Sequence, residues 1–66
     1  MDEQLRQRIV VAPKVMAGKP IIRGTRVPVG VVVRMLAQGV SEDALLAEYP
    51  RLHPADVRAA LAYSQD

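Results

Sequence analysis

Hydrophobic positions in the first third of this chain fall in short β-branched runs, separated by polar residues, glycine and proline. The runs are residues 9–11 and 21–22, and the turn between them contains Gly18 and Pro20. β-Branched residues favour strands, and glycine and proline favour turns, so this pattern predicts an antiparallel hairpin. The polar residues 1–8 that precede it predict a flexible arm.

The next segment, residues 27–38, has apolar residues spaced for either a strand or one face of a helix. Pro28 suits a first helical position and Gly39 suits the position just past a helix end, which favours the helix. Gly30 disfavours the helix by roughly 1 kcal/mol, because glycine has a low helix propensity. We therefore predict a helix that begins at Pro28 and ends before Gly39.

Two more helices are predicted in the second half of the chain. Ser41 can cap the first of them, whose opening carboxylates suit the positive end of the helix dipole, and Pro50 ends it. Pro54 suits the first position of the last helix, with Asp56 in its first turn. Three helices are thus expected across residues 27–64.

The last two predicted helices and their short turn have the outline of a DNA-binding helix-turn-helix. DNA contacts would come from the turn and from the outer face of the last helix: Arg51, His53, Ala55 and Arg58. Ala59 and Ala62 complete this outer face, and the predicted inward positions are Val57, Ala60, Leu61 and Ser64. Alanine offers no hydrogen bond to a base, so packing against a protein and simple exposure to water stay open as alternatives.

Composition narrows the class of protein. A chain of 66 residues forms one domain and buries only about 60% of the surface that its unfolded form exposes, so a partner is expected, and we predict a homodimer. The sequence has no cysteine, no apolar run near the roughly 20 residues that cross a bilayer, and no signal-peptide pattern. These features predict a cytoplasmic protein without membrane contact.

The sequence does not predict an active site. An active site needs an acid, a base, a nucleophile or a metal held in a cleft, and the candidates here are isolated. His53 precedes a helix, where capping or exposure is the simpler interpretation, and Glu42 with Asp43 suits a helix start. We predict a protein that is not an enzyme, with no catalytic residue, cofactor, metal site or small-molecule substrate.

Charge is divided unevenly along the chain. Residues 1–34 hold seven basic and two acidic side chains, whereas residues 35–66 hold two basic and five acidic side chains. Charge separated in this way points the N-terminal half at a negative surface, either nucleic acid or the acidic pocket of another protein.

The basic turn at residues 23–26, Arg-Gly-Thr-Arg, closes the hairpin segment 9–26. Arginine matches carboxylates and phosphates two contacts at a time, and glycine permits a tight turn. The predicted partner-binding site combines this turn with two nearby basic residues: Lys19, Arg23, Gly24, Thr25, Arg26 and Arg34. The alternative is a plain connector with solvated arginines and Thr25 as a helix cap.

Several segments resemble a small prokaryotic family, domain of unknown function 433: residues 18–29, 39–42, 48–52 and 56–63. The resemblance implies that the predicted mainly α fold, a three-helix helix-turn-helix bundle with a short N-terminal β-hairpin, is homeodomain-like or winged-helix-like. It also implies an antitoxin similar to those of the VapB kind, whose partner is a PIN-like ribonuclease with metal-binding carboxylates. Arg23 or Arg26 would then enter the acidic pocket of that toxin and displace metal or substrate.

Two departures qualify this resemblance. We expect no long toxin-wrapping tail after Asp66, and His53 stands where a serine or threonine cap is expected. The expected function is an antitoxin of a type II toxin–antitoxin system, which neutralises its PIN-like ribonuclease through the folded body or the N-terminal arm and represses its operon by binding operator DNA. The alternatives are a stand-alone DNA-binding transcriptional regulator and a structural protein-interaction module.

Overall fold

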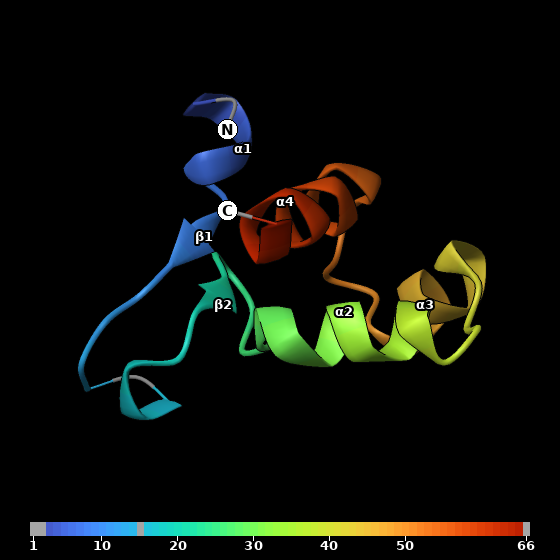
Figure 1. Ribbon diagram of the computed structural model, residues 1–66, viewed down its shortest axis with the longest axis horizontal. Coiled ribbons are helices and arrows are strands. Elements are labelled where there is room, and N and C mark those ends of the chain that lie inside the picture. Colours follow the sequence, from blue (N-terminus) through green and yellow to red (C-terminus); the bar gives the residue numbers. More distant parts are fainter. Residues whose placement is uncertain (1–2, 15, 66) are drawn as a thin grey trace.

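A computed structural model describes residues 3–14 and 16–65 of the chain (Figure 1). Its described elements follow in this order: α1 (Glu3–Arg6), β1 (Ile9–Val10), the 3-10 turn η1 (Met16–Gly18), β2 (Ile21–Ile22), α2 (Val29–Ala37), α3 (Glu42–Glu48) and α4 (Pro54–Gln65). The mainly helical fold with a short hairpin is confirmed. None of the helices in this part of the chain is long and apolar enough to cross a membrane.

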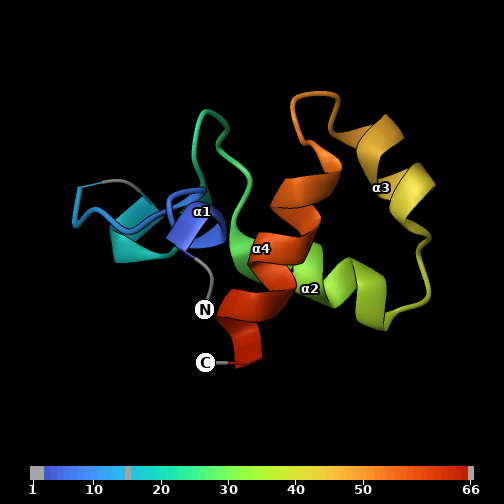
Figure 2. The ribbon, with the colours of Figure 1, turned by 90° about the horizontal axis from the view of Figure 1, so that it is seen from above.

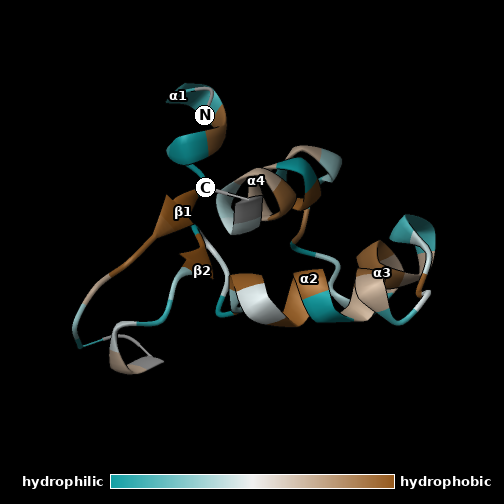
Figure 3. Ribbon diagram, viewed as in Figure 1, coloured by the Kyte–Doolittle hydropathy of each residue, from teal (hydrophilic) through white to brown (hydrophobic). Residues whose placement is uncertain are grey.

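The two strands form the predicted antiparallel hairpin. Ile9 pairs with Ile22 and Val10 with Ile21, and both strands are coloured as hydrophobic in Figure 3. Ile22 is completely buried, whereas Val11, predicted to extend the first strand, lies beyond it and is exposed. The hairpin therefore attaches to the core mainly through its second strand.

The helix α2 ends as the sequence predicts and begins one residue later. Pro28 is its N-cap in an extended conformation rather than its first helical residue. At the other end Gly39 has a φ of 93°, and its N–H donates to the Leu36 carbonyl while the Val40 N–H donates to Met35. This is the Schellman arrangement, in which a left-handed glycine satisfies the last carbonyls of a helix.

Both remaining helices have side-chain oxygens that satisfy an N–H at their start. The Ser41 hydroxyl accepts a hydrogen bond from the Ala44 N–H at 3.1 Å, which confirms the predicted cap of α3. The helix α4 begins at Pro54, and the Asp56 carboxylate accepts the His53 N–H at 2.8 Å. This is the return half of a capping box, so α4 starts on a firm cap without the expected serine or threonine.

The core lies where α4 crosses α2, with α3 closing one end (Figure 2). Its buried members come from the second strand, all three long helices and the turn before α4: Ile22, Val29, Val32, Leu45, Leu52, Val57 and Ala60. These side chains are small or β-branched apart from two leucines. Apolar burial at this crossing is the main favourable term that holds the elements together.

The segment predicted to be a flexible arm contains a helical turn. The helix α1 packs against α4, and Leu5 is half-buried, while residues 1 and 2 of that arm lie outside the described part of the chain. A four-residue helix is too short to be stable alone, so its packing against α4 supports it.

This packing corrects the predicted faces of α4. Ala59, expected on the outer face, is completely buried, and Ala55 and Ala62 on the same stripe are half-buried. Leu61, expected to point inward, is 37% exposed, and Ser64 is exposed as well. A single inward face was predicted, but α4 has neighbours on two sides, because α2 and α1 both pack against it.

Candidate partner-binding interface

The basic turn is a tight reversal that needs a glycine. The Thr25 N–H donates to the Ile22 carbonyl at 3.1 Å, and Gly24 has a φ of +80°. A positive φ at the third residue of such a four-residue turn is the mark of type II, in which glycine fits without strain. Open space surrounds Gly24, so its backbone angle rather than crowding explains the residue.

Thr25 braces the turn from inside. Its hydroxyl donates to the Ile22 carbonyl at 2.8 Å and accepts from the Val27 N–H at 3.0 Å. The Ile22 N–H in turn donates to the Val27 carbonyl at 3.0 Å, which closes the loop at its base. The connector alternative supposed that Thr25 caps α2, but Thr25 bonds within the turn instead. The turn therefore holds its arginines on a fixed backbone.

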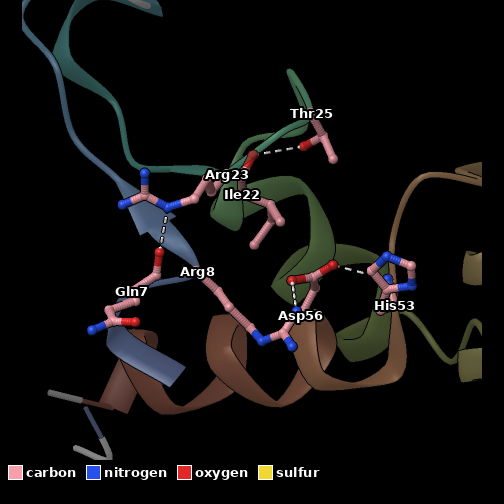
Figure 4. A network of polar contacts seen from close by, with 7 residues as sticks. All are labelled: Gln7, Arg8, Ile22, Arg23, Thr25, His53 and Asp56. Carbon is pink, nitrogen blue, oxygen red and sulfur yellow. Dashed lines mark hydrogen bonds and ion pairs between the residues drawn. The ribbon is translucent and has the colours of Figure 1, made fainter. Parts of the chain in front are cut away.

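Both arginines of the turn are exposed. The Arg23 Nε donates to the Gln7 carbonyl (Figure 4). The Arg23 N–H donates to the Arg8 carbonyl at 2.7 Å. Within residues 3–14 and 16–65 neither Arg23 nor Arg26 forms an ion pair with a carboxylate. Their guanidinium groups keep donors available for an anionic partner.

Arg8, which no sequence pattern indicated, anchors the arm to the helix α4. Its guanidinium forms an ion pair with Asp56 at 2.9 Å, and the second oxygen of that carboxylate accepts the His53 N–H (Figure 4). Asp56 is only 4% exposed, and both of its oxygens are satisfied. The two charges are 48 positions apart in the sequence, so no local pattern could have paired them.

The turn at residues 23–26 and the turn between α3 and α4 project from the same end of the molecule, at the top of Figure 2. A groove of about 540 Å³ between them includes Arg26 and Arg51 in its lining. A second groove of about 470 Å³ shares Gly24 and Arg51 with the first and is lined also by His53. The two grooves therefore form one continuous surface.

A third groove, of about 560 Å³, extends this surface along α1 and α4. It shares Arg8 and Arg23 with the second and adds Ala55 and Arg58. We call the five arginines and the histidine that line the three grooves the basic face: Arg8, Arg23, Arg26, Arg51, His53 and Arg58. The predicted partner-binding turn at residues 23–26 thus lies on the same side of the molecule as the residues predicted to contact DNA.

Two residues predicted for the partner-binding site lie elsewhere. Lys19 and Arg34 line a different groove of about 390 Å³, together with Gly30 and neighbouring apolar residues. Neither belongs to the three grooves of the basic face. Proximity in sequence to the turn was misleading, because the chain reverses at the turn and α2 leads away from it. Their part in binding stays a prediction.

The residues predicted to contact DNA are only partly presented by α4. Arg51, His53 and Arg58 are exposed, whereas Ala55 is half-buried in the groove shared with Leu5 of α1. A helix that enters the major groove needs one side free along its length. On α4 the alanine stripe is buried or half-buried, and the helix α1 packs against α4. The exposed stripe of α4 includes Arg58, Leu61 and Ser64, so it offers one arginine.

Comparison with known proteins places the chain among proteins of one family. The family model described as "Protein of unknown function (DUF433)" matches residues 9–64. A crystal structure of a DUF433 member protein from Anabaena variabilis is 38% identical and superposes with a TM-score of 0.85, covering 96% of this chain and 62% of that protein.

Two curated relatives are also similar to the chain. The uncharacterized protein y4eO of Sinorhizobium fredii is 35% identical over 60 residues, which are 91% of this chain and 27% of that protein. An uncharacterized protein of Archaeoglobus fulgidus is 59% identical over 29 residues, which are 44% of this chain and 81% of that protein. The chain therefore spans about a quarter of the Sinorhizobium relative.

Proposed function

The chain belongs to the DUF433 family, and on that premise we propose that it is an antitoxin of a type II toxin–antitoxin system, which neutralises a PIN-like ribonuclease. The observation that carries the proposal is the state of Arg23 and Arg26: they are exposed, without carboxylate partners in the described residues, and held on a braced turn. The protein acts by binding and is not an enzyme.

The chemistry of the toxin explains the fit. A metal-dependent ribonuclease gathers carboxylates around its metal ions, and a guanidinium matches a carboxylate with two parallel hydrogen bonds. Because the hydrogen bonds of Thr25 fix the turn before binding, less conformational entropy is lost on association. Arg23 or Arg26 would occupy the acidic pocket and compete with metal or RNA for its carboxylates.

The test is inhibition of the co-purifying ribonuclease, measured by cleavage of a fluorogenic RNA. The double variant Arg23→Ala/Arg26→Ala should weaken inhibition by about tenfold or more, since hydrogen bonds to charged groups contribute about 1.5 to 3 kcal/mol each. The charge-matched variant Arg6→Ala/Lys14→Ala removes two exposed cations that line none of the three grooves and should weaken inhibition far less. Equal inhibition by wild type and the first double variant would refute the arginine mechanism.

A second activity, repression of its own operon, is favoured by the position of Arg51 and Arg58 on the same face as the turn. We propose that operator DNA binds this face through its phosphates. Such binding weakens steeply with salt, so a gel-shift titration should show a strongly negative slope of affinity against salt concentration. DNA binding without any toxin inhibition would favour the stand-alone regulator, and the absence of both activities would favour a structural interaction module.

We also propose that the protein works in the cytoplasm and as a homodimer, as paired half-sites in operator DNA would require. Light scattering on the eluted protein gives its mass directly. A mass twice that of the chain supports the dimer, and a monomer at the concentrations used for DNA binding would exclude it.

A further inference from the structure

The groove between the basic turn and the turn after α3 combines two chemical surfaces. We call it the loop–turn groove, and its lining includes Arg26, Val27, Glu48, Tyr49, Pro50 and Arg51. Val27, Tyr49 and Pro50 give it an apolar part, and arginines stand on both sides. Its volume of about 540 Å³ lies within the usual range of binding sites, which is roughly 300 to 1,000 Å³.

The apolar part of this groove is held in place by the core. Val27 and Tyr49 are half-buried and pack against the core cluster, so their remaining exposed surface cannot rearrange freely. Pro50 is exposed and has a fixed backbone angle. A preformed apolar recess of this kind suits one aliphatic side chain, because burial of that side chain releases water without reordering the walls.

The polar part offers donors for carboxylates. Arg26 and Arg51 are exposed and have no ion-pair partner among the described residues. The backbone N–H groups of Gly24 and Arg26 donate no hydrogen bond to any described residue. Beyond Arg51 the groove continues into the part of the basic face that holds Arg23 and Arg8.

We propose that the loop–turn groove binds a linear peptide segment of the partner protein, in which one aliphatic side chain is followed by acidic residues. This inference rests on the proposed partner-binding function and names the feature that the site recognises. The aliphatic side chain lies against Val27, Tyr49 and Pro50. The acidic side chains lie along Arg26, Arg51 and Arg23, toward the second groove.

The composition of the groove favours a peptide over a nucleic acid. Single-stranded nucleic acids bind where aromatic faces are free to stack with bases, and the one aromatic residue here, Tyr49, packs against the core. The apolar part of the groove, formed by Val27, Tyr49 and Pro50, suits the aliphatic side chain of a peptide, which a nucleic acid does not carry.

The test uses synthetic fluorescein-labelled peptides in a polarisation assay with the full chain. The first peptide has one leucine followed by aspartate and glutamate residues. The second replaces the leucine with alanine, and the third replaces the acidic residues with their amides. We expect binding of the first peptide and a loss of about fivefold or more for each of the other two, since a buried leucine and a charged hydrogen bond each contribute at least about 1 kcal/mol.

Three single substitutions and one control define the groove. Arg26→Ala and Arg51→Ala should each weaken binding of the first peptide by about fivefold or more. Glu48→Gln should strengthen binding of the first peptide, because it removes a negative charge that repels the acidic residues of that peptide. Lys14→Ala removes an exposed cation that does not line the groove and should leave affinity unchanged. Tighter binding by Glu48→Gln is a result that general loss of folding would not produce.

Several outcomes would overturn the inference. Equal affinity for all three peptides, preferential binding of a short oligothymidylate over the acidic peptide, or indifference to both arginine substitutions would each exclude acidic-peptide recognition in this groove. The proposed antitoxin function can be separated from it. If ribonuclease inhibition still depends on Arg23 and Arg26 while no acidic peptide binds, the groove inference fails and the proposed function stands.

Discussion

Gly24 and Gly30 form a natural comparison at the level of single residues. Both have open space where a Cβ would be added, but Gly24 has a φ of +80° and Gly30 lies inside α2. We expect Gly24→Ala to destabilise the fold by about 1 kcal/mol, since an L-residue is disfavoured in the left-handed region. Gly30→Ala should stabilise it by about 0.5 to 1 kcal/mol through higher helix propensity. Urea unfolding at equilibrium measures both, and effects of the same sign would contradict this account.

Asp56 gives a second prediction at this scale. Asp56→Ala removes the capping hydrogen bond to the His53 N–H and the ion pair with Arg8, and should destabilise the fold by about 1 to 2 kcal/mol. Arg8→Ala should cost less than about 1 kcal/mol, because the Arg8 side chain is 39% exposed and its ion pair is screened. Denaturation of both single variants and the double variant isolates the pairing energy. Equal losses for the two single variants would show that the ion pair outweighs the cap.

How far the site could be predicted follows from the same residues. The sequence located the turn at residues 23–26 and its glycine, because a tight turn and its charges are local features. It missed Arg8 and placed Lys19 and Arg34 with the turn, although they line a separate groove. Which charges share a surface depends on the packing of distant elements, and no spacing in the chain records that arrangement.

Among the elements, α1 is the one that local patterns did not indicate. Four residues cannot form a stable helix alone, and the segment has mostly polar side chains, so its sequence predicts an arm. Capped elements such as α2 and α3 were predictable, because the Schellman glycine and the serine cap are local signals. The second buried side of α4 could not be predicted, because it depends on the packing of α1 against this helix.

The packing of α1 on α4 leads to a prediction at the scale of elements. A truncated chain that begins at Gln7 keeps the carbonyl that accepts the Arg23 Nε but loses the cover of the alanine stripe. We expect it to remain folded with a lower melting temperature, because the core cluster contains no residue of α1. Hydrogen exchange should speed up at the amides of α4 around Ala59 and change little in α2. Unchanged protection throughout α4 would show that α1 contributes no cover.

At the scale of the whole molecule, the charges of the basic face lower the stability of the fold and favour binding of an anionic partner. Five arginines line three connected grooves, and one of them, Arg8, forms an ion pair among the described residues. Like charges held on one face repel each other, and screening by salt relieves that repulsion. Stability of the fold and strength of partner binding should therefore respond to salt in opposite directions.

This opposition is measurable on the wild-type protein. Raising sodium chloride from low to physiological concentration should raise the melting temperature modestly, while it slows association with an anionic partner and weakens the complex. The variant Arg26→Ala/Arg51→Ala should be at least as stable as wild type in low salt, because it removes exposed charges that support no described contact. Calorimetry in a salt series and stopped-flow association with the acidic peptide provide the two measurements. A melting temperature that falls with added salt, or a double variant that is clearly less stable, would mean that these arginines serve the fold and not a partner.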